Sequence, residues 1–202
     1  MISAFPEDDQ IAKELASIGL AVKSVYDLVN TRQSYPEAIP ILLKWLDKGI
    51  ESKNIEEGVV RALTAKEAKG VAGKILFKAF YRRDEPAVRW VIGNAFTVVV
   101  MPDDLEEIIE IVENKEYGMS RQMFVLALGK LKGDRAEETL LKRLKEGDLV
   151  LHVISALGTL KSLAAEKYLI PYLDSSHTAT RKAAESALKK ISKAKEKKSK
   201  RR

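Results

Sequence analysis

An alanine followed by leucine or phenylalanine recurs along this 202-residue sequence at a nearly constant interval. Successive pairs begin 33, 32, 29 and 31 residues apart. A period of roughly 20 to 50 residues is typical of stacked repeats, in which each unit buries its hydrophobic face only against its neighbours. The sequence therefore predicts a repeat architecture. The five pairs are Ala62–Leu63, Ala95–Phe96, Ala127–Leu128, Ala156–Leu157 and Ala187–Leu188.

A second set of apolar residues precedes these pairs and repeats at a similar interval. Each member of the set is two large apolar residues four positions apart, which lie on one face of a helix. The later residues of successive members are 34, 32, 32 and 29 positions apart. We therefore predict an all-α fold in which each repeat contains a first and a second amphipathic helix. The five members are Leu42–Leu46, Leu76–Phe80, Ile108–Val112, Leu140–Leu144 and Leu169–Leu173.

One second helix carries a recognisable motif. Residues 173–191, LDSSHTATRKAAESALKKI, combine Asp174 in a predicted turn with Arg181 in the helix that follows. This pattern resembles the HEAT-repeat family, especially the short bacterial repeats of the phycobilisome-lyase type. Other repeats share it in part, and in the fourth repeat Val150 stands where the arginine belongs. The resemblance covers residues 34–191 and implies a right-handed α-solenoid of about five helical pairs.

The repeat pattern divides the chain into three predicted parts. Residues 1–33 contain two helices that do not fit the repeat, and we expect them to cap the open end of the first repeat. Residues 34–191 form the repeat region, in which Pro171 falls inside the last first helix and is predicted to kink it. Residues 192–202 are a low-complexity run of lysine, serine and arginine, which predicts a disordered basic tail.

The net charge of +6 comes from the C-terminus. Residues 189–202 hold nine Lys or Arg and one acid, whereas residues 1–188 hold 26 basic and 28 acidic side chains. Such a cationic tail predicts a weak, salt-dependent and sequence-independent contact with nucleic acid. The tail residues assigned to this contact are Lys195, Lys197, Lys198, Lys200, Arg201 and Arg202.

The sequence also indicates the cellular compartment. It contains no cysteine, which excludes disulfide and thiol chemistry and fits a reducing compartment. The segment Met1–Gln10 is short and acidic, unlike a signal peptide. The apolar runs are far shorter than the roughly 18 to 20 residues that span a bilayer. We therefore expect a cytoplasmic protein that does not associate with membranes.

The second helices carry apolar residues on two faces. At 100° per residue, one face forms a predicted core stripe, which in the third repeat is Met123, Phe124, Ala127, Leu128 and Leu131. In HEAT solenoids the second helices line the concave surface, so the resemblance places the opposite face in a groove. An exposed apolar patch there would mark an interaction site for a partner protein. The predicted groove residues are Trp90, Gln122, Val125, Leu151 and Ile154.

Two alternatives to an open groove are left by the sequence. The end helices or a neighbouring element could fold over this face and cover it. A rotation of the fourth repeat by one residue would instead bury Leu151.

A ladder of arginines follows the same repeat. Arg89, Arg121 and Arg181 occupy equivalent positions on the flank between core and groove. We predict a structural role, in which each arginine bonds a turn aspartate or backbone carbonyl of the adjacent repeat. The alternative is that these side chains face a ligand.

The residue types that carry catalysis or bind metals are sparse. His152 lies at a core-facing position and His177 in a turn, and neither has a second metal ligand at a suitable spacing. The segment 70–74, GVAGK, lacks the full spacing of a phosphate-binding loop. The acidic residues between 103 and 116 belong to a solvated helix face. We therefore predict no enzymatic activity, no metal and no cofactor.

Two classes of function remain. The first is a non-enzymatic scaffold that grips a partner protein along the groove. The second is nucleic-acid binding, either through the basic tail or in the manner of the alkylpurine DNA glycosylases, which are built from HEAT-like repeats. The glycosylase reading requires a cationic groove and a catalytic aspartate, whereas the body is net acidic and Trp90 has no aspartate on its face. A third possibility, chromophore-lyase activity, is implied by the fold resemblance alone.

Overall fold

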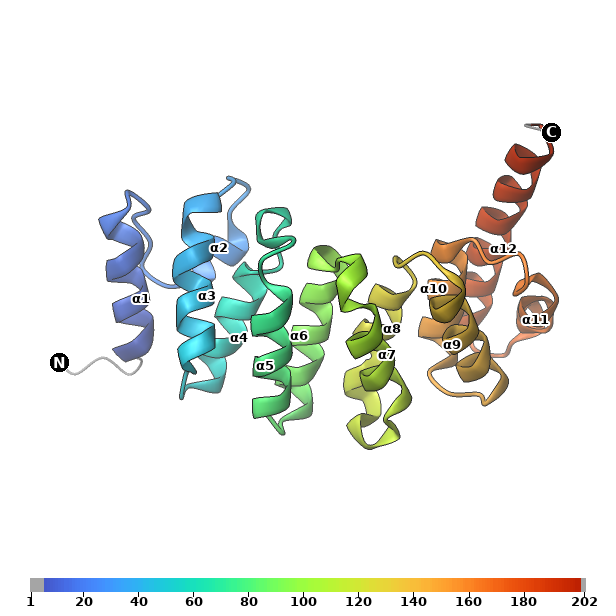
Figure 1. Ribbon diagram of the computed structural model, residues 1–202, viewed down its shortest axis with the longest axis horizontal. Coiled ribbons are helices and arrows are strands. Elements are labelled where there is room, and N and C mark those ends of the chain that lie inside the picture. The colour runs from blue at the N-terminus through green and yellow to red at the C-terminus, as the bar shows by residue number, and fades with distance from the viewer. Residues whose placement is uncertain (1–5, 201–202) are drawn as a thin grey trace. The chain divides into compact units, whose positions relative to one another are not determined.

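The computed structural model describes residues 6–200, and every regular element in that range is a helix (Figure 1). The predicted all-α class is therefore confirmed. The chain divides into two compact units, residues 1–101 and residues 102–202. The sequence repeat continues across this boundary. The interval of 32 residues from Ala95 to Ala127 differs by at most three residues from the other intervals between Ala-Leu or Ala-Phe pairs.

Unit 1 consists of two rows of helices. Helices α1, α3 and α5 pack against one another in one row, and α2, α4 and α6 pack in the other (Figure 1). The pairs α3–α4 and α5–α6 join the two rows. The elements are α1 (Pro6–Ser17), α2 (Tyr26–Asn30), the 3-10 turn η1 (Pro36–Ala38), α3 (Ile39–Lys48), α4 (Lys53–Ala62), η2 (Lys66–Ala68), α5 (Gly73–Arg82) and α6 (Pro86–Val99).

The acids at the start of α1 tie it to the first repeat. The carboxylate of Glu7 accepts hydrogen bonds from the backbone N–H groups of Glu51 and Ser52, at 2.9 and 3.0 Å. These two residues precede α4, so Glu7 supplies acceptors near an N-terminus whose N–H groups lack partners within the helix. Asp8, which is buried, accepts from the backbone N–H of Val25 at 2.8 Å. The two N-terminal helices thus extend the two rows.

Unit 2 has the same plan. Helices α8, α10 and α12 pack side by side, and α7, α9 and α11 pack against them. The elements are η3 (Pro102–Asp104), α7 (Leu105–Glu113), η4 (Lys115–Arg121), α8 (Gln122–Leu128), α9 (Asp134–Lys145), α10 (Val150–Leu160), α11 (Glu166–Leu169), η5 (Ile170–Asp174) and α12 (Thr178–Ser199).

The apolar ladders form the cores of both units. The predicted core stripe of the third repeat is buried throughout, and so are the first-helix pairs with the exception of Leu173. Leu173 lies in η5, because α11 ends at Leu169 and the chain continues as a 3-10 helix through Pro171. In place of the predicted kink, the structure has a change from α-helix to 3-10 helix just before Pro171, which the missing N–H and the ring of proline explain.

The basic C-terminus differs from its prediction. Residues 192–199, expected to be disordered, continue α12 to Ser199. Alanine, lysine and glutamate have high helix propensities, and the buried Ile191 anchors the preceding turn. Lys195 also pairs with Glu166 of α11 at 3.0 Å. The tail residues Arg201 and Arg202 lie outside the described residues.

Between residues 6 and 200, no helix is both long enough and apolar enough to cross a membrane.

Candidate functional site

The structure separates the predicted groove residues into two groups. Trp90, Gln122 and Leu151 are partly exposed, whereas Val125 and Ile154 have no exposed surface at all. Val125 and Ile154 therefore cannot line an open groove, and their assignment is corrected. Trp90 belongs to unit 1, whereas Gln122 and Leu151 belong to unit 2.

Close contact between second helices explains this burial. A Cβ atom at Gly129 would lie 2.6 Å from the Cα of Ala156, and one at Gly158 would lie 2.6 Å from the Cβ of Ala187. These glycines therefore allow α8, α10 and α12 to approach closely. Val125 and Ile154 lie one turn before Gly129 and Gly158, so they share the faces that meet the next second helix.

Gln122 and Leu151 lie together in a pocket of about 470 Å³ in unit 2. We call it the turn pocket, because the inter-helix turns before α8 and α10 supply most of its wall. Its lining includes the apolar residues Met119, Leu149 and Val150, which were not among the predicted site residues. The complete lining is Gly118, Met119, Arg121, Gln122, Asp148, Leu149, Val150, Leu151 and His152.

The first wall of the turn pocket is shaped by Gly118. This residue has φ 51° and ψ −129° and breaks the 3-10 helix η4. A positive φ is readily adopted by glycine and costs other residues free energy. The next residue, Met119, is 63% exposed. A flexible, polarisable methionine on a surface suits variable apolar contacts.

The second wall is shaped by Leu149, which precedes α10 in the left-handed region at φ 49°. This conformation costs a residue with a Cβ roughly 1–2 kcal/mol. The backbone carbonyl of Leu149 nevertheless accepts hydrogen bonds from the N–H groups of His152 and Val153, at 2.9 and 3.0 Å. Leu149 therefore provides the first hydrogen-bond acceptor of α10. Strained residues of this kind cluster at functional sites, and here the strain lies at the pocket itself.

The floor of the turn pocket is an ion pair. Arg121, only 4% exposed, donates two hydrogen bonds to Asp148, at 2.7 and 3.0 Å. The same guanidinium donates to the carbonyls of Val112 and Gly118, both at 3.0 Å. Arg143, 3% exposed, lies 3.7 Å from the Asp148 carboxylate. Bidentate charge-assisted bonds are strong and fix the geometry of both turns.

The ion pair sets the charge of Asp148. Burial alone would raise the pKa of this carboxyl, but the hydrogen bond from Arg121 and the charges of Arg121, Arg143 and Lys115 together outweigh it. The pKa of Asp148 therefore lies below its ordinary value of 3.8. At neutral pH the floor holds a carboxylate paired with Arg121, which donates four hydrogen bonds within the chain, so we expect a ligand to gain most from the apolar rim.

His152 supplies a test of the pocket environment. Burial lowers its pKa from 6.5, because desolvation disfavours the imidazolium. We expect an NMR titration of the native protein to give a His152 pKa below 6.5, and the same titration in denaturant to restore the ordinary value. The unfolded chain then binds more protons, so this residue lowers stability as the pH falls below about 6.5. A native pKa at or above the denatured value would contradict the burial.

The arginine ladder has carbonyl partners in all three repeats. Arg89 donates to the carbonyl of Phe80 at 3.2 Å, near the C-terminus of α5. Arg121 makes the equivalent bond to Val112 near the end of α7, and Arg181 donates to the carbonyl of Ser175 at 2.7 Å. The last carbonyls of a helix have no partner within it, so these bonds satisfy otherwise free acceptors. These carbonyls belong to the arginine's own repeat and not to the adjacent repeat, so that part of the prediction is corrected; only Arg121 also reaches the next repeat, through Asp148.

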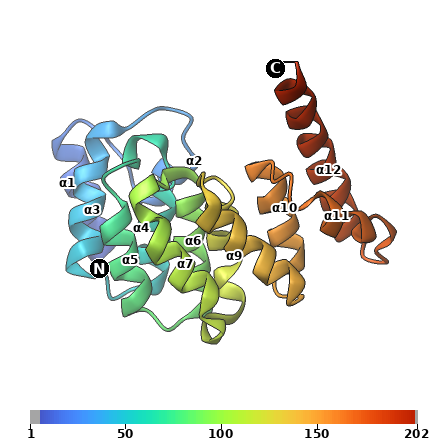
Figure 2. The ribbon, with the colours of Figure 1, turned by 45° about the vertical axis from the view of Figure 1, so that its right-hand side comes forward.

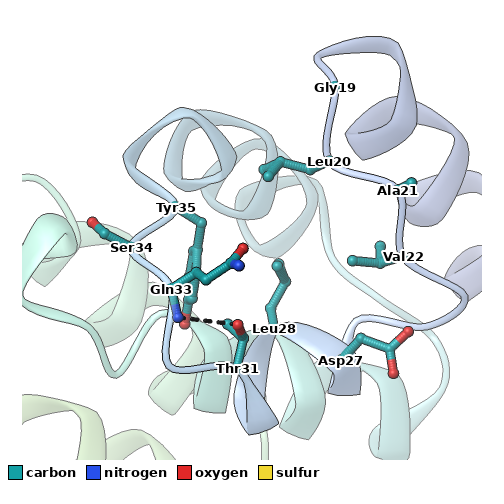
Figure 3. Close-up of a pocket in the computed structure, with 10 residues that line it drawn as sticks. All are labelled: Gly19, Leu20, Ala21, Val22, Asp27, Leu28, Thr31, Gln33, Ser34 and Tyr35. Carbon is teal, nitrogen blue, oxygen red and sulfur yellow. Dashed lines mark hydrogen bonds between the residues drawn. The ribbon is translucent and has the colours of Figure 1, made fainter.

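Unit 1 contains a second hollow, of about 280 Å³, between the loop after α1 and the segment that follows α2 (Figure 3). Leu28 rises into it from α2, with Leu20 above (Figure 3). Its polar groups bond within the chain: Thr31 accepts from the N–H of Gln33 at 3.1 Å, and Asp27 accepts from the N–H of Lys23 at 2.8 Å. These bonds shape a loop, and we do not assign the hollow to a ligand.

Over residues 6–200, no three His, Cys, Asp or Glu side chains are grouped so that they could hold a metal ion. No model of a known protein family matches the sequence, and a comparison with curated proteins finds no match.

Proposed function

We propose that this chain is a non-enzymatic interaction module that binds a partner protein, and that the turn pocket is part of its binding surface. The observation that carries the proposal is the rim of Met119, Leu149, Val150 and Leu151, which surrounds an ion pair already bonded within the chain. A concave, mostly apolar site with few polar groups is the usual form of a binding pocket. An apolar side chain of a partner segment would fill it and displace water from the rim.

We also propose that the helical pairs continue through the chain as HEAT-like repeats of a right-handed solenoid. The sequence period supports this, since the spacing of the Ala-Leu or Ala-Phe pairs is maintained across residues 101 and 102. The two units support it too, because each contains the same two rows of first and second helices. Stacked repeats present extended surfaces that suit protein partners. The absence of cysteine fits a reducing compartment such as the cytoplasm.

Paired variants test the binding site. Met119→Asp and Leu151→Asp place a charge in the apolar rim, whereas Ile170→Asp places the same charge on another exposed apolar residue of unit 2. In affinity capture from the native lysate with quantitative mass spectrometry, we expect the Met119 and Leu151 variants to lose at least tenfold of the specific partner. The Ile170 variant should retain it. Full recovery by the Met119/Leu151 double variant would overturn the assignment.

The second predicted class of function, nucleic-acid binding, is supported by the exposed lysines of α12.

Trp90 remains a predicted partner-contact residue of unit 1, and Trp90→Ala in the same capture experiment tests its role.

A further inference from the structure

Helix α12 carries a regular row of lysines on one side. At 3.6 residues per turn, Lys182, Lys189, Lys193, Lys197 and Lys200 fall within a narrow arc, and Lys190 lies beside them. We call these six residues the lysine face. All six are exposed, and none forms an ion pair with another residue of the described chain. Glu185 and Glu196 lie at one edge of the arc, which leaves the face strongly positive.

The opposite side of α12 packs against other helices of unit 2. Ala184, Ala187 and Ile191 are buried there, and α12 packs against α10 and α11. Farther along, Lys195 turns to this side and pairs with Glu166. The last turns of α12 extend beyond the other helices of unit 2 in both views (Figure 1, Figure 2). The lysine face is therefore positioned by a folded helix and is open along its length.

Packing and helix propensity do not require this arrangement of charge. Lys189, Lys193 and Lys197 are spaced four residues apart, and like charges at this spacing destabilise a helix. Each lysine on this side could be replaced by glutamine without loss of helix propensity. The cost is offset when a polyanion neutralises the row.

We propose that the lysine face of α12 binds the phosphate backbone of nucleic acid without reading its sequence. From Lys182 to Lys200 the helix extends about 27 Å at 1.5 Å per residue. Double-stranded DNA carries one negative charge per roughly 1.7 Å of its axis, so a linear row of cations is matched along its whole length. This surface lies apart from the turn pocket, and the proposal is independent of the protein-binding function.

A membrane surface fits the same helix less well. Helices that lie on bilayers insert an apolar face rich in Trp, Phe or Leu opposite their cations. In α12 that face is already buried against protein, and beyond Ile191 it continues as Ala194, Lys195 and Lys198. Binding to a nucleic-acid duplex requires only accessible cations, so a duplex fits the lysine face better than a membrane does.

The test measures binding of the full chain to a fluorescent 20-base-pair duplex of arbitrary sequence over a salt series. We expect log affinity to fall linearly with log salt, since each phosphate contact contributes about −0.9 to the slope. The triple variant Lys189→Gln/Lys193→Gln/Lys197→Gln should reduce the slope by about 2 to 3 and weaken binding at low salt by about tenfold or more. Circular dichroism confirms that the helix is retained.

A matched control removes the same charge elsewhere. Lys66→Gln/Lys69→Gln/Lys74→Gln changes three exposed lysines of unit 1 and should leave the slope and affinity close to those of the native chain. Equal weakening by both triple variants would overturn the proposal, because net charge and not the lysine face would then set the affinity. Tighter binding to phosphatidylserine vesicles or polyglutamate than to the duplex would overturn it as well, in favour of a membrane or an acidic protein.

Discussion

Replacement of Glu56 by alanine is expected to destabilise unit 1 by about 3–5 kcal/mol, the range seen when one partner of a buried ion pair is removed. Glu56 lies in α4 and has no exposed surface. Its carboxylate accepts a hydrogen bond from Arg82 at 2.9 Å and another from Arg83. Both arginines stand at the C-terminal end of α5, so one carboxylate joins two helices.

The same arginines also satisfy backbone carbonyls. Arg82 donates to the carbonyl of Leu46 at 2.8 Å, and Arg83 donates to that of Ile50. Glu56 therefore neutralises two guanidinium groups that hold the end of α3 against α5. Without it, two positive charges remain partly buried beside one another, and a cavity replaces the carboxyl side chain.

The adjacent residue provides a control. Glu57 pairs with Arg61 one turn along α4 at 2.7 Å, and both side chains are partly exposed. Glu57→Ala should cost no more than about 0.5 kcal/mol, as is typical of such pairs. Denaturation followed by tryptophan fluorescence reports on unit 1, because the two tryptophans are Trp45 and Trp90. A Glu56→Ala protein within 1 kcal/mol of the native chain would show that the pair contributes little.

Replacement of Asp148 by alanine is expected to destabilise unit 2 by about 3 kcal/mol, because it removes the carboxylate that Arg121 and Arg143 share. Both arginines are almost completely buried. Arg121 retains its carbonyl partners and Arg143 retains Glu146 at 2.9 Å, so the loss falls at the lower end of the range for buried pairs. Hydrogen exchange at the amides of α8 and α10 measures the effect locally.

The contribution of Asp148 depends on pH in a defined direction. Its pKa is lower in the folded protein than the ordinary value of 3.8, so the stabilisation is complete above that value. It is lost as the pH falls through the folded pKa, where the carboxylate becomes protonated. The stability difference between the native chain and Asp148→Asn should therefore be constant near neutrality and shrink below about pH 3.8. A difference that persisted undiminished at lower pH would show that the charge is not the cause.

The sequence determined the helices and their core faces. Pairs such as Leu76 and Phe80 are apolar at helical spacing, and burial of that stripe is the only way to remove it from water. The α-helix stops just before Pro171 because proline lacks an N–H and its ring clashes with the preceding turn, and both properties can be read from the sequence. Arg121 lies at an equivalent repeat position to Arg89, so a shared carbonyl contact could be expected, but the pattern predicted a partner in the adjacent repeat and the structure has it in the same repeat.

The tertiary structure decided which of the remaining faces are open. Periodicity gives the direction of a side chain but not the distance to the next helix, and at Gly129 and Gly158 that distance is short enough to bury Val125 and Ile154. The turn pocket depends on the backbone at Gly118 and Leu149, whose positive φ values have no periodic signal. Glu56 meets Arg82 and Arg83 across 26 and 27 positions of sequence, and such pairs are set by packing alone. A helical pattern fixes what must be buried, whereas only the approach of neighbouring helices fixes what is left accessible to a partner.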